Sequence, residues 1–217
     1  MELTKFGHAC VQIADGDRRL AIDPGVFTEV SQALTDIDAV LITHEHADHL
    51  DVDKLAAAAA QNPALQVWAP QAVADQLAGN QVLSGRVTAV GPGQSFVAGG
   101  LQVRTFGGQH ALIHSSIPVI ANVGYLVGDA VYHPGDSYIV PNANVEALLV
   151  PINAPWSKVA EAMDFTISVR AARAFQIHDG LLNDAGHGLY EGQLTRVGQL
   201  YGVTRFQHLD SGESIRL

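Results

Sequence analysis

The sequence predicts a single layered α/β domain, and three observations support this. The chain has 217 residues, of which 47% are hydrophobic, which is enough for one sizeable core but short for two. Short apolar segments typical of strands recur along the chain and alternate with segments typical of helices. No linker or low-complexity segment interrupts this alternation. We therefore expect one domain over residues 1–217.

The predicted strands begin with a hairpin. Residues 2–14 and 18–23 alternate in polarity on either side of the turn Asp15-Gly16-Asp17. Residues 39–43 form a short apolar run, as expected of a strand that is buried on both faces. Gly128-Asp129 has the composition of a two-residue hairpin loop. Further strands are expected at residues 66–69, 94–97, 101–106, 122–127, 130–133, 147–150, 174–177, 205–209 and 214–217.

The predicted helices are fewer. An alanine-rich helix is expected over residues 53–61, with Asp51 as a capping residue and Pro63 directly after its end. Three more are expected at residues 71–78, 157–172 and 190–201.

Charge and composition limit the partners. The formal net charge is −10 and the 12 basic residues are scattered, which argues against nucleic-acid binding. The single cysteine, Cys10, excludes disulfides and makes a thiolate zinc site improbable. The chain shows no secretion signal and no membrane-spanning apolar run. We therefore expect a cytoplasmic protein with no membrane partner. The sequence does not indicate its oligomeric state.

One segment carries most of the chemistry. Residues 44–49 hold three histidines and two acids, in the pattern H-x-H-x-D-H formed by His44, His46, Asp48 and His49. Neighbouring titratable groups compete for protons and resist burial unless they are paired. A bound cation relieves this, because it takes neutral imidazole nitrogens and carboxylate oxygens as ligands. The segment directly follows the predicted strand at residues 39–43, and it predicts a pair of metal ions.

Ligand-type residues follow other predicted strands in the same way. His110 comes after the strand at residues 101–106 and the flexible Gly107-Gly108 pair. Asp136, His178 and Asp23 each lie just beyond the end of a strand. A rigid sheet can in this way assemble a metal site from distant positions of the chain.

With these positions the chain resembles the metallo-β-lactamase-fold superfamily of metal-dependent hydrolases. The resemblance rests on Asp23 in Ala-Ile-Asp-Pro-Gly, the H-x-H-x-D-H motif, His110, Asp136 in His-Pro-Gly-Asp-Ser, and His178, which appear in the superfamily's order and spacing. The opening Phe6-Gly7-His8-Ala9 is similar to the subgroup of ascorbate-6-phosphate lactonase-like proteins.

The resemblance implies a four-layer αββα sandwich with a dinuclear metal centre at one edge of the β-sandwich. His44, His46 and His110 would hold one ion, and Asp48, His49 and His178 the other, with Asp136 between them. Asp48 would also be catalytic, orienting the nucleophile or moving its proton. Asp23 would hydrogen-bond a ligating imidazole. Zinc is the expected metal, and manganese, iron or nickel are alternatives.

For some of the predicted roles the sequence offers more than one candidate residue. His114 lies four residues after His110 and competes with it as a ligand, although His110 is nearer the strand end. His8, His114 and Trp156 are candidates for contacting the substrate. Lys158 and Arg104 are the nearest basic residues in sequence that could hold a phosphate.

The expected function is hydrolysis of a small lactone, ester, amide or phosphodiester. The lack of a secretion signal argues against a β-lactamase, and the lack of a basic face argues against a nuclease. A non-catalytic metal- or partner-binding protein of the same fold is an alternative. A di-iron redox protein is less expected, because His46 is not glutamate and the chain has no room for a flavin domain.

Overall fold

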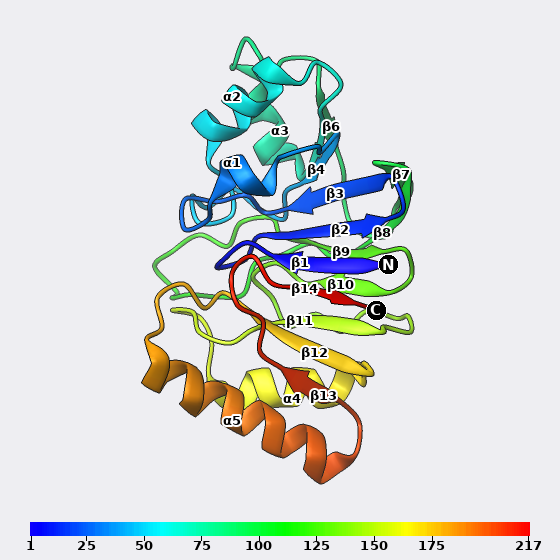
Figure 1. The fold of residues 1–217 in the computed structure, drawn as a ribbon. Coiled ribbons are helices and arrows are strands. Elements are labelled where there is room, and N and C mark those ends of the chain that lie inside the picture. The colour runs from blue at the N-terminus through cyan, green and yellow to red at the C-terminus, as the bar shows by residue number, and fades with distance from the viewer.

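The computed structural model describes residues 1–217. Two mixed sheets of seven strands lie face to face, and helices cover the outer face of each sheet. Figure 1 shows α1, α2 and α3 on one outer side and α4 and α5 on the other. The predicted four-layer αββα sandwich is therefore confirmed.

The first sheet is antiparallel on one side and parallel on the other. Strands β14, β1, β2 and β3 pair antiparallel, whereas β3 to β6 pair parallel. Its strands, in spatial order, are β14 (Ser214–Arg216), β1 (Glu2–Lys5), β2 (Val11–Asp15), β3 (Arg18–Ile22), β4 (Ala39–Leu41), β5 (Gln66–Ala69) and β6 (Val87–Ala89).

The second sheet follows the same plan. Strands β7 to β10 pair antiparallel, and β10 to β13 pair parallel. Its strands, in spatial order, are β13 (Arg205–Gln207), β12 (Arg173–Ile177), β11 (Ala147–Pro151), β10 (Val131–His133), β9 (Val123–Val127), β8 (Leu101–Gly107) and β7 (Ser95–Ala98).

Three apolar layers hold the sandwich together. The largest lies between the sheets and includes Leu3, Ile13, Tyr125 and Phe175, all fully buried. The other two lie between each sheet and its helices. The Tyr125 hydroxyl donates to the Ile42 carbonyl oxygen at 2.8 Å, which satisfies a buried polar group and links the second sheet to the first.

The helices are α1 (Val30–Ala33), α2 (Val52–Gln61), α3 (Gln71–Ala78), α4 (Val159–Val169) and α5 (Asp184–Tyr201). Asp51 caps α2 as predicted, because its side chain accepts the Lys54 backbone N–H. None of the helices is long and apolar enough to span a membrane.

The topology explains why the ligand-type residues converge. The parallel pairing of β3 with β4, and of β10, β11 and β12, places the carboxyl ends of these strands at one edge. Strand β8 points the same way as β10, since both pair antiparallel with β9. Asp23, His44, His110, Asp136 and His178 come just after these strands.

Several predicted ends differ from the structure by two or three residues, such as those of α4, which spans Val159–Val169 and not residues 157–172. Larger differences concern the first strand, the last helix and two short elements. Residues 2–14 are not one strand, because the chain turns at Gly7 and His8, which have φ of +96° and +38°. The last helix begins at Asp184, not at residue 190; its early glycines weaken the helical signal. The short elements α1 and β6 were not predicted, since neither is long enough to show a periodic pattern.

Gly25 is where the loop after β3 packs against the H-x-H-x-D-H motif. A Cβ atom added at Gly25 would lie 1.9 Å from the Asp48 carbonyl oxygen and 2.5 Å from the His49 backbone nitrogen. The Gly25 backbone thus contacts the H-x-H-x-D-H segment at a distance that no other residue allows.

We expect Gly25→Ala to lower the free energy of unfolding by roughly 1–3 kcal/mol, because the motif backbone must shift to admit the methyl group. Chemical denaturation of both proteins measures the difference. The matched control is Gly91→Ala, where an added Cβ meets nothing within 4 Å. Equal stability of the two variants would contradict the packing described here.

Candidate metal centre

A buried carboxylate organises the start of the motif. Asp23 is fully buried, and its carboxylate accepts hydrogen bonds from the Thr43 backbone N–H at 2.8 Å and the Thr43 hydroxyl at 2.6 Å. Asp23 Oδ2 also lies 2.7 Å from His49 Nδ1, which donates to it. This bond places the ring proton of His49 on Nδ1 and leaves the Nε2 lone pair facing the interior.

The same reasoning fixes the ring of His44. The Thr43 hydroxyl uses its proton on Asp23, so it can only accept from His44 Nδ1, which lies 3.0 Å away. The lone pair of His44 is therefore on Nε2, which lies 3.1 Å from His46 Nδ1. Two nitrogens on one zinc ion would be roughly 3.3 Å apart, given Zn–N distances near 2.0–2.1 Å.

His110 and His178 are oriented by backbone carbonyls. His110 Nδ1 donates to the Ala111 carbonyl oxygen at 2.6 Å, and His178 Nδ1 donates to the Asn153 carbonyl oxygen at 2.7 Å. Both rings consequently turn Nε2 towards the same interior point. His178 has a φ of +58°, a backbone conformation that ends strand β12.

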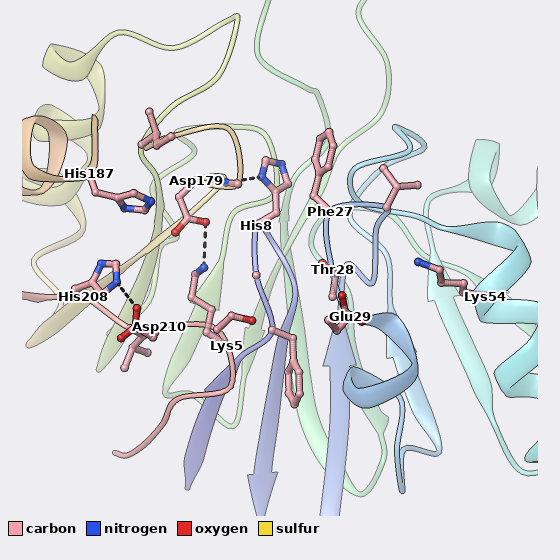
Figure 2. A pocket seen from close by; sticks show the side chains of 17 residues that line it. Lys5, His8, Phe27, Thr28, Glu29, Lys54, Asp179, His187, His208 and Asp210 are labelled. Carbon is pink, nitrogen blue, oxygen red and sulfur yellow. Dashed lines mark hydrogen bonds and ion pairs between the residues drawn. The ribbon is translucent and has the colours of Figure 1, made fainter. Parts of the chain in front are cut away.

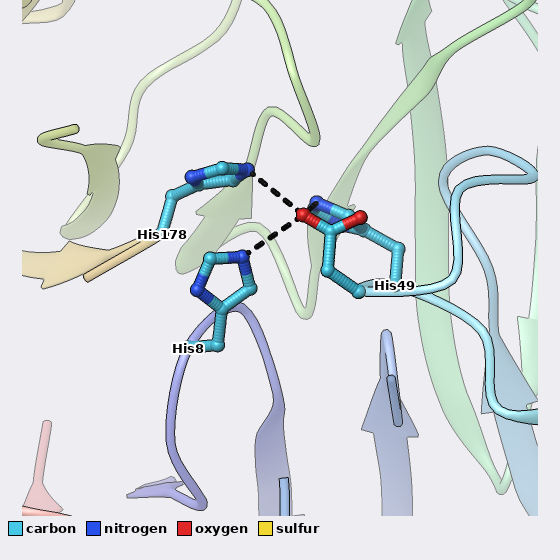
Figure 3. Close-up of side chains that lie close together, drawn as sticks. His8, His49 and His178 are labelled. Carbon is cyan, nitrogen blue, oxygen red and sulfur yellow. Dashed lines mark hydrogen bonds and ion pairs between the residues drawn. The ribbon is translucent and has the colours of Figure 1, made fainter. Parts of the chain in front are cut away.

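These side chains form two adjacent clusters of metal-ligand type. The first cluster is His44, His46, His110 and Asp136, and the second is His8, Asp48, His49 and His178. Within each cluster, one donor atom from every residue lies within 4.8 Å of the others. Figure 3 shows the rings of His8, His49 and His178 converging from three segments of the chain.

Asp136 lies between the two clusters. Its Oδ2 is 3.3 Å from His110 Nε2 and 3.2 Å from His178 Nε2, and its Oδ1 is 3.0 Å from His49 Nε2. The Trp156 indole N–H donates to the same Oδ2 at 2.8 Å. One carboxylate thus contacts imidazoles of both clusters.

The centre contains polar atoms that the protein itself does not satisfy. His49 Nε2, His110 Nε2, His178 Nε2 and Asp136 Oδ1 are buried and have no hydrogen-bond partner. Native proteins leave few such atoms, and three imidazole nitrogens around one carboxylate is a donor set that divalent cations take. The residues present therefore fit a metal centre.

Burial and neighbouring charges together shift the pKa values of the groups in the two clusters. Burial lowers the pKa of His44 well below its ordinary value, as neighbouring imidazoles also do. Burial also disfavours the protonated form of His178, but Asp136 and Asp48 outweigh it and raise its pKa to about 9. Burial would raise the pKa of Asp136, yet the surrounding histidines, His49 above all, hold it well below the usual range. Asp136 is thus a carboxylate anion at neutral pH.

His8 differs from the other imidazoles. Its Nδ1 accepts the Gly180 backbone N–H at 3.1 Å, so its own proton is on Nε2, and this nitrogen donates to Asp48 Oδ2 at 3.2 Å. Burial lowers the pKa of His8, which favours this neutral form. His8 therefore offers the centre a proton donor, not a lone pair.

The structure brings most of the predicted residues together. All seven predicted ligands and His8 lie in the two clusters, Asp23 contacts His49, and Trp156 contacts Asp136. His114 lies apart: it is exposed and pairs with Ser116. Arg104 pairs with Asp129 on the surface, away from the clusters.

Several contributors were not anticipated from the sequence. The Thr43 hydroxyl and the carbonyls of Ala111 and Asn153 orient the imidazoles. A backbone carbonyl carries no sequence signal, so its contribution could not be predicted. Thr43 could have been noticed, because it directly precedes His44.

A third group of ligand-type side chains lies outside the centre and is already satisfied. Glu191 Oε1 lies 2.8 Å from both His187 Nδ1 and His208 Nδ1, and His208 Nε2 lies 3.2 Å from Asp210. His208 is partly exposed, and although burial opposes protonation, these carboxylates raise its pKa. The group is therefore explained by hydrogen bonding alone.

Comparison with known sequences places the chain in a family. Residues 2–178 match the beta-lactamase superfamily domain. Protein Rv0786c of Mycobacterium tuberculosis is 41% identical over 202 residues, which cover 91% of this chain and 92% of that protein. The UPF0173 protein PF0020 of Pyrococcus furiosus is 30% identical over 199 residues, covering 85% of this chain and 86% of that protein.

Solved structures share the fold at low sequence identity. YhfI of Bacillus subtilis, described as a metallo-beta-lactamase fold protein, aligns with a TM-score of 0.77 at 18% identity, covering 99% of this chain and 98% of that one. CmlA, a diiron β-hydroxylase from Streptomyces venezuelae, aligns with a TM-score of 0.71 at 17% identity, covering 100% of this chain and 54% of that one. Since the fold is found in a redox enzyme as well, the fold alone does not select a chemistry.

Relatives in sequence indicate the type of chemistry more closely than the fold does. A UPF0173 metal-dependent hydrolase of Aeropyrum pernix is 33% identical over 153 residues, which cover 62% of this chain and 61% of that protein. The chain belongs to the beta-lactamase superfamily, within the UPF0173 family of metal-dependent hydrolases.

Proposed function

We propose that this protein hydrolyses a small lactone, ester, amide or phosphodiester with a dinuclear metal centre. The observation that carries the proposal is the set of three unpartnered imidazole nitrogens around the Asp136 carboxylate. His44, His46 and His110 would hold one ion, Asp48, His49 and His178 the other, and Asp136 both. Zinc is the metal we favour, since nitrogen and carboxylate ligands suit it, and manganese, iron or nickel remain alternatives.

When bound, two divalent ions would supply a water-derived nucleophile at neutral pH and polarise the oxygen of the scissile group. The protein's own contribution begins with Asp48. Its side chain is 25% exposed, whereas that of Asp136 is 3% exposed, so Asp48 is the carboxylate of the centre that faces solvent. Burial would raise its pKa, but His178 and His8 hold it below the usual range. We propose that ionised Asp48 orients the attacking water and accepts its proton.

Asp23 and Trp156 would act by positioning other residues of the centre. Asp23 orients His49 by accepting its Nδ1 proton, and Trp156 holds Asp136 in place through its indole N–H. Trp156 is 9% exposed and covers one side of the carboxylate, which keeps water from it.

The similarity of Phe6-Gly7-His8-Ala9 to lactonase-like proteins adds lactones to the candidate substrates. A cytoplasmic location stays a prediction from the sequence.

His8 would be a positioning residue for Asp48. It donates to Asp48 Oδ2 from one side, while His178 Nε2 lies 3.4 Å from the same oxygen. Gly180 and His8 thereby tie the carboxylate to the loop after β12. The sequence suggested a substrate contact for His8; its burial to 1% exposure favours this positioning role.

The metal centre itself is tested by ligand replacement. We expect His46→Ala and Asp136→Ala to abolish hydrolysis and to lower the metal content measured by mass spectrometry, because each removes a ligand. Chelation of the wild-type protein should abolish hydrolysis of a panel of lactones, esters, amides and phosphodiesters, and added zinc should restore it. Full zinc occupancy in both variants would contradict the ligand assignment.

A second pair of variants separates two histidines that the sequence leaves in competition. His110→Ala should reduce zinc stoichiometry, since His110 Nε2 faces Asp136. His114→Ala should bind as much zinc as the wild type, because His114 is exposed and pairs with Ser116. Equal zinc loss in the two variants would refute the choice of His110.

The role of His8 is tested by comparing metal content with turnover. We expect His8→Ala to keep the wild-type zinc stoichiometry but to lower kcat about 10- to 100-fold, as loss of an outer hydrogen-bond partner typically does. His8→Gln should recover part of this loss, because its amide N–H can donate to Asp48. If His8→Ala instead loses zinc to the same extent as His178→Ala, then His8 is a ligand and the positioning role is wrong.

A further inference from the structure

Two hollows adjoin the metal centre from different sides. The first, of about 450 Å³, is the polar hollow shown in Figure 2, lined by Lys5, His8, Asp179, His187 and His208 among others. The residue it shares with the two ligand clusters is His8. The second, of about 430 Å³, is lined by His110, Trp156, Leu112, Tyr138, Ile139 and Glu161 among others. We call this second one the apolar hollow.

The apolar hollow is directly connected to the candidate reaction centre. His110 and Trp156, which line it, both contact Asp136 Oδ2, at 3.3 and 2.8 Å. The Trp156 and His110 rings lie 6.0 Å apart in an edge-on arrangement. A molecule held in this hollow would therefore extend from the metal ligands outwards. Its volume is within the range of small-molecule sites, about 300–1,000 Å³.

The side chains of the hollow present apolar surface. Leu112 and Ile139 are 59% and 42% exposed, which is high for aliphatic residues beside a buried polar centre. The Tyr138 hydroxyl donates to the Pro151 carbonyl oxygen at 2.8 Å, and the Trp156 N–H donates to Asp136. Both aromatic residues thus have their polar atoms engaged, which leaves their rings for contact with a ligand.

The hollow holds no positive charge. No lysine or arginine lines it, and its one acidic side chain, Glu161, accepts the Lys158 backbone N–H at the start of α4. The two lysines of the polar hollow are already paired, Lys5 with Asp179 at 3.0 Å and Lys54 with Asp51 at 3.3 Å. A phosphate or carboxylate on the distal part of a substrate would find no counter-charge in the apolar hollow.

We propose that the apolar hollow binds an uncharged aliphatic or aromatic portion of the substrate, so that the protein acts on neutral apolar esters, lactones or amides. This inference rests on the proposed hydrolytic function and specifies its substrate class. It selects against phosphorylated substrates, which the lactonase-like similarity alone would admit.

The test uses the zinc-loaded full chain and p-nitrophenyl esters from acetate to octanoate. We expect kcat/KM to rise with acyl length by about two- to fourfold per methylene until the hollow is filled, because each buried methylene is stabilising. The pentanoate ester should be hydrolysed at least tenfold more efficiently than the hemiglutarate ester, which has the same length but ends in a carboxylate.

Variants assign the effect to this hollow. Leu112→Asn and Ile139→Asn should flatten the dependence on acyl length, measured as the ratio of kcat/KM for the octanoate ester to kcat/KM for the acetate ester. Leu200→Asn is the matched control, because Leu200 is 70% exposed on α5 and outside the hollow. A flat dependence in the wild type, or an unchanged dependence in both hollow variants, would overturn the inference and leave the proposed hydrolysis standing.

Failure of the proposed hydrolysis can be distinguished from failure of the inference about the hollow. If zinc is bound but no ester of any length is hydrolysed, ester hydrolysis is refuted. A ligand-binding experiment then tests whether the hollow takes an uncharged apolar group. Hexanamide should then bind and change a fluorescence signal that disappears in Trp156→Phe, whereas acetamide, which lacks the apolar tail, should bind at least tenfold more weakly. Equal binding of hexanamide and acetamide, or no binding of hexanamide, would refute the inference.

Discussion

The centre depends on the buried Asp23 carboxylate. It accepts two hydrogen bonds from Thr43 and one from His49, and thereby connects the end of β3 with the H-x-H-x-D-H motif after β4. A buried carboxylate is costly unless it is fully paired, so the loop must adopt the one arrangement that supplies these donors. Because the Thr43 hydroxyl is committed to Asp23, it also fixes the ring of His44. One acid thus determines the direction of two lone pairs.

The second constraint is the crowding around Asp136. Imidazole nitrogens of His49, His110 and His178 point at this carboxylate without a hydrogen bond, and Trp156 closes its remaining side. Native proteins leave few buried polar atoms without a hydrogen-bond partner, and here four lie together. Divalent cations would satisfy these atoms, and they compete with protons for the same lone pairs.

The residues that would carry out the chemistry and those that would contact the substrate lie on different parts of the fold. The strand ends position the ligand-type residues, whereas the surrounding loops, with Leu112 and Ile139 exposed, form the surface that a substrate would contact under the proposed function. His8 and Trp156 link the two parts: each lines a hollow and donates a hydrogen bond to a carboxylate of the centre. Under the proposed function, substitutions in these loops would change the substrate without disturbing the ligand-type residues.

The sequence by itself determined the layered α/β class, most strands, the capping of α2 and the ligand-type residues, because hydrophobic period and strand-end position are local properties. It could not determine the break at Gly7 and His8, where a positive φ overrides strand propensity. Only the tertiary structure separated His110 from His114, turned His8 towards Asp48 and placed Trp156 on Asp136. The contacts of His8 and Trp156 join residues that are distant in sequence, and the carbonyls of Ala111 and Asn153 that orient the rings of His110 and His178 carry no side-chain signal.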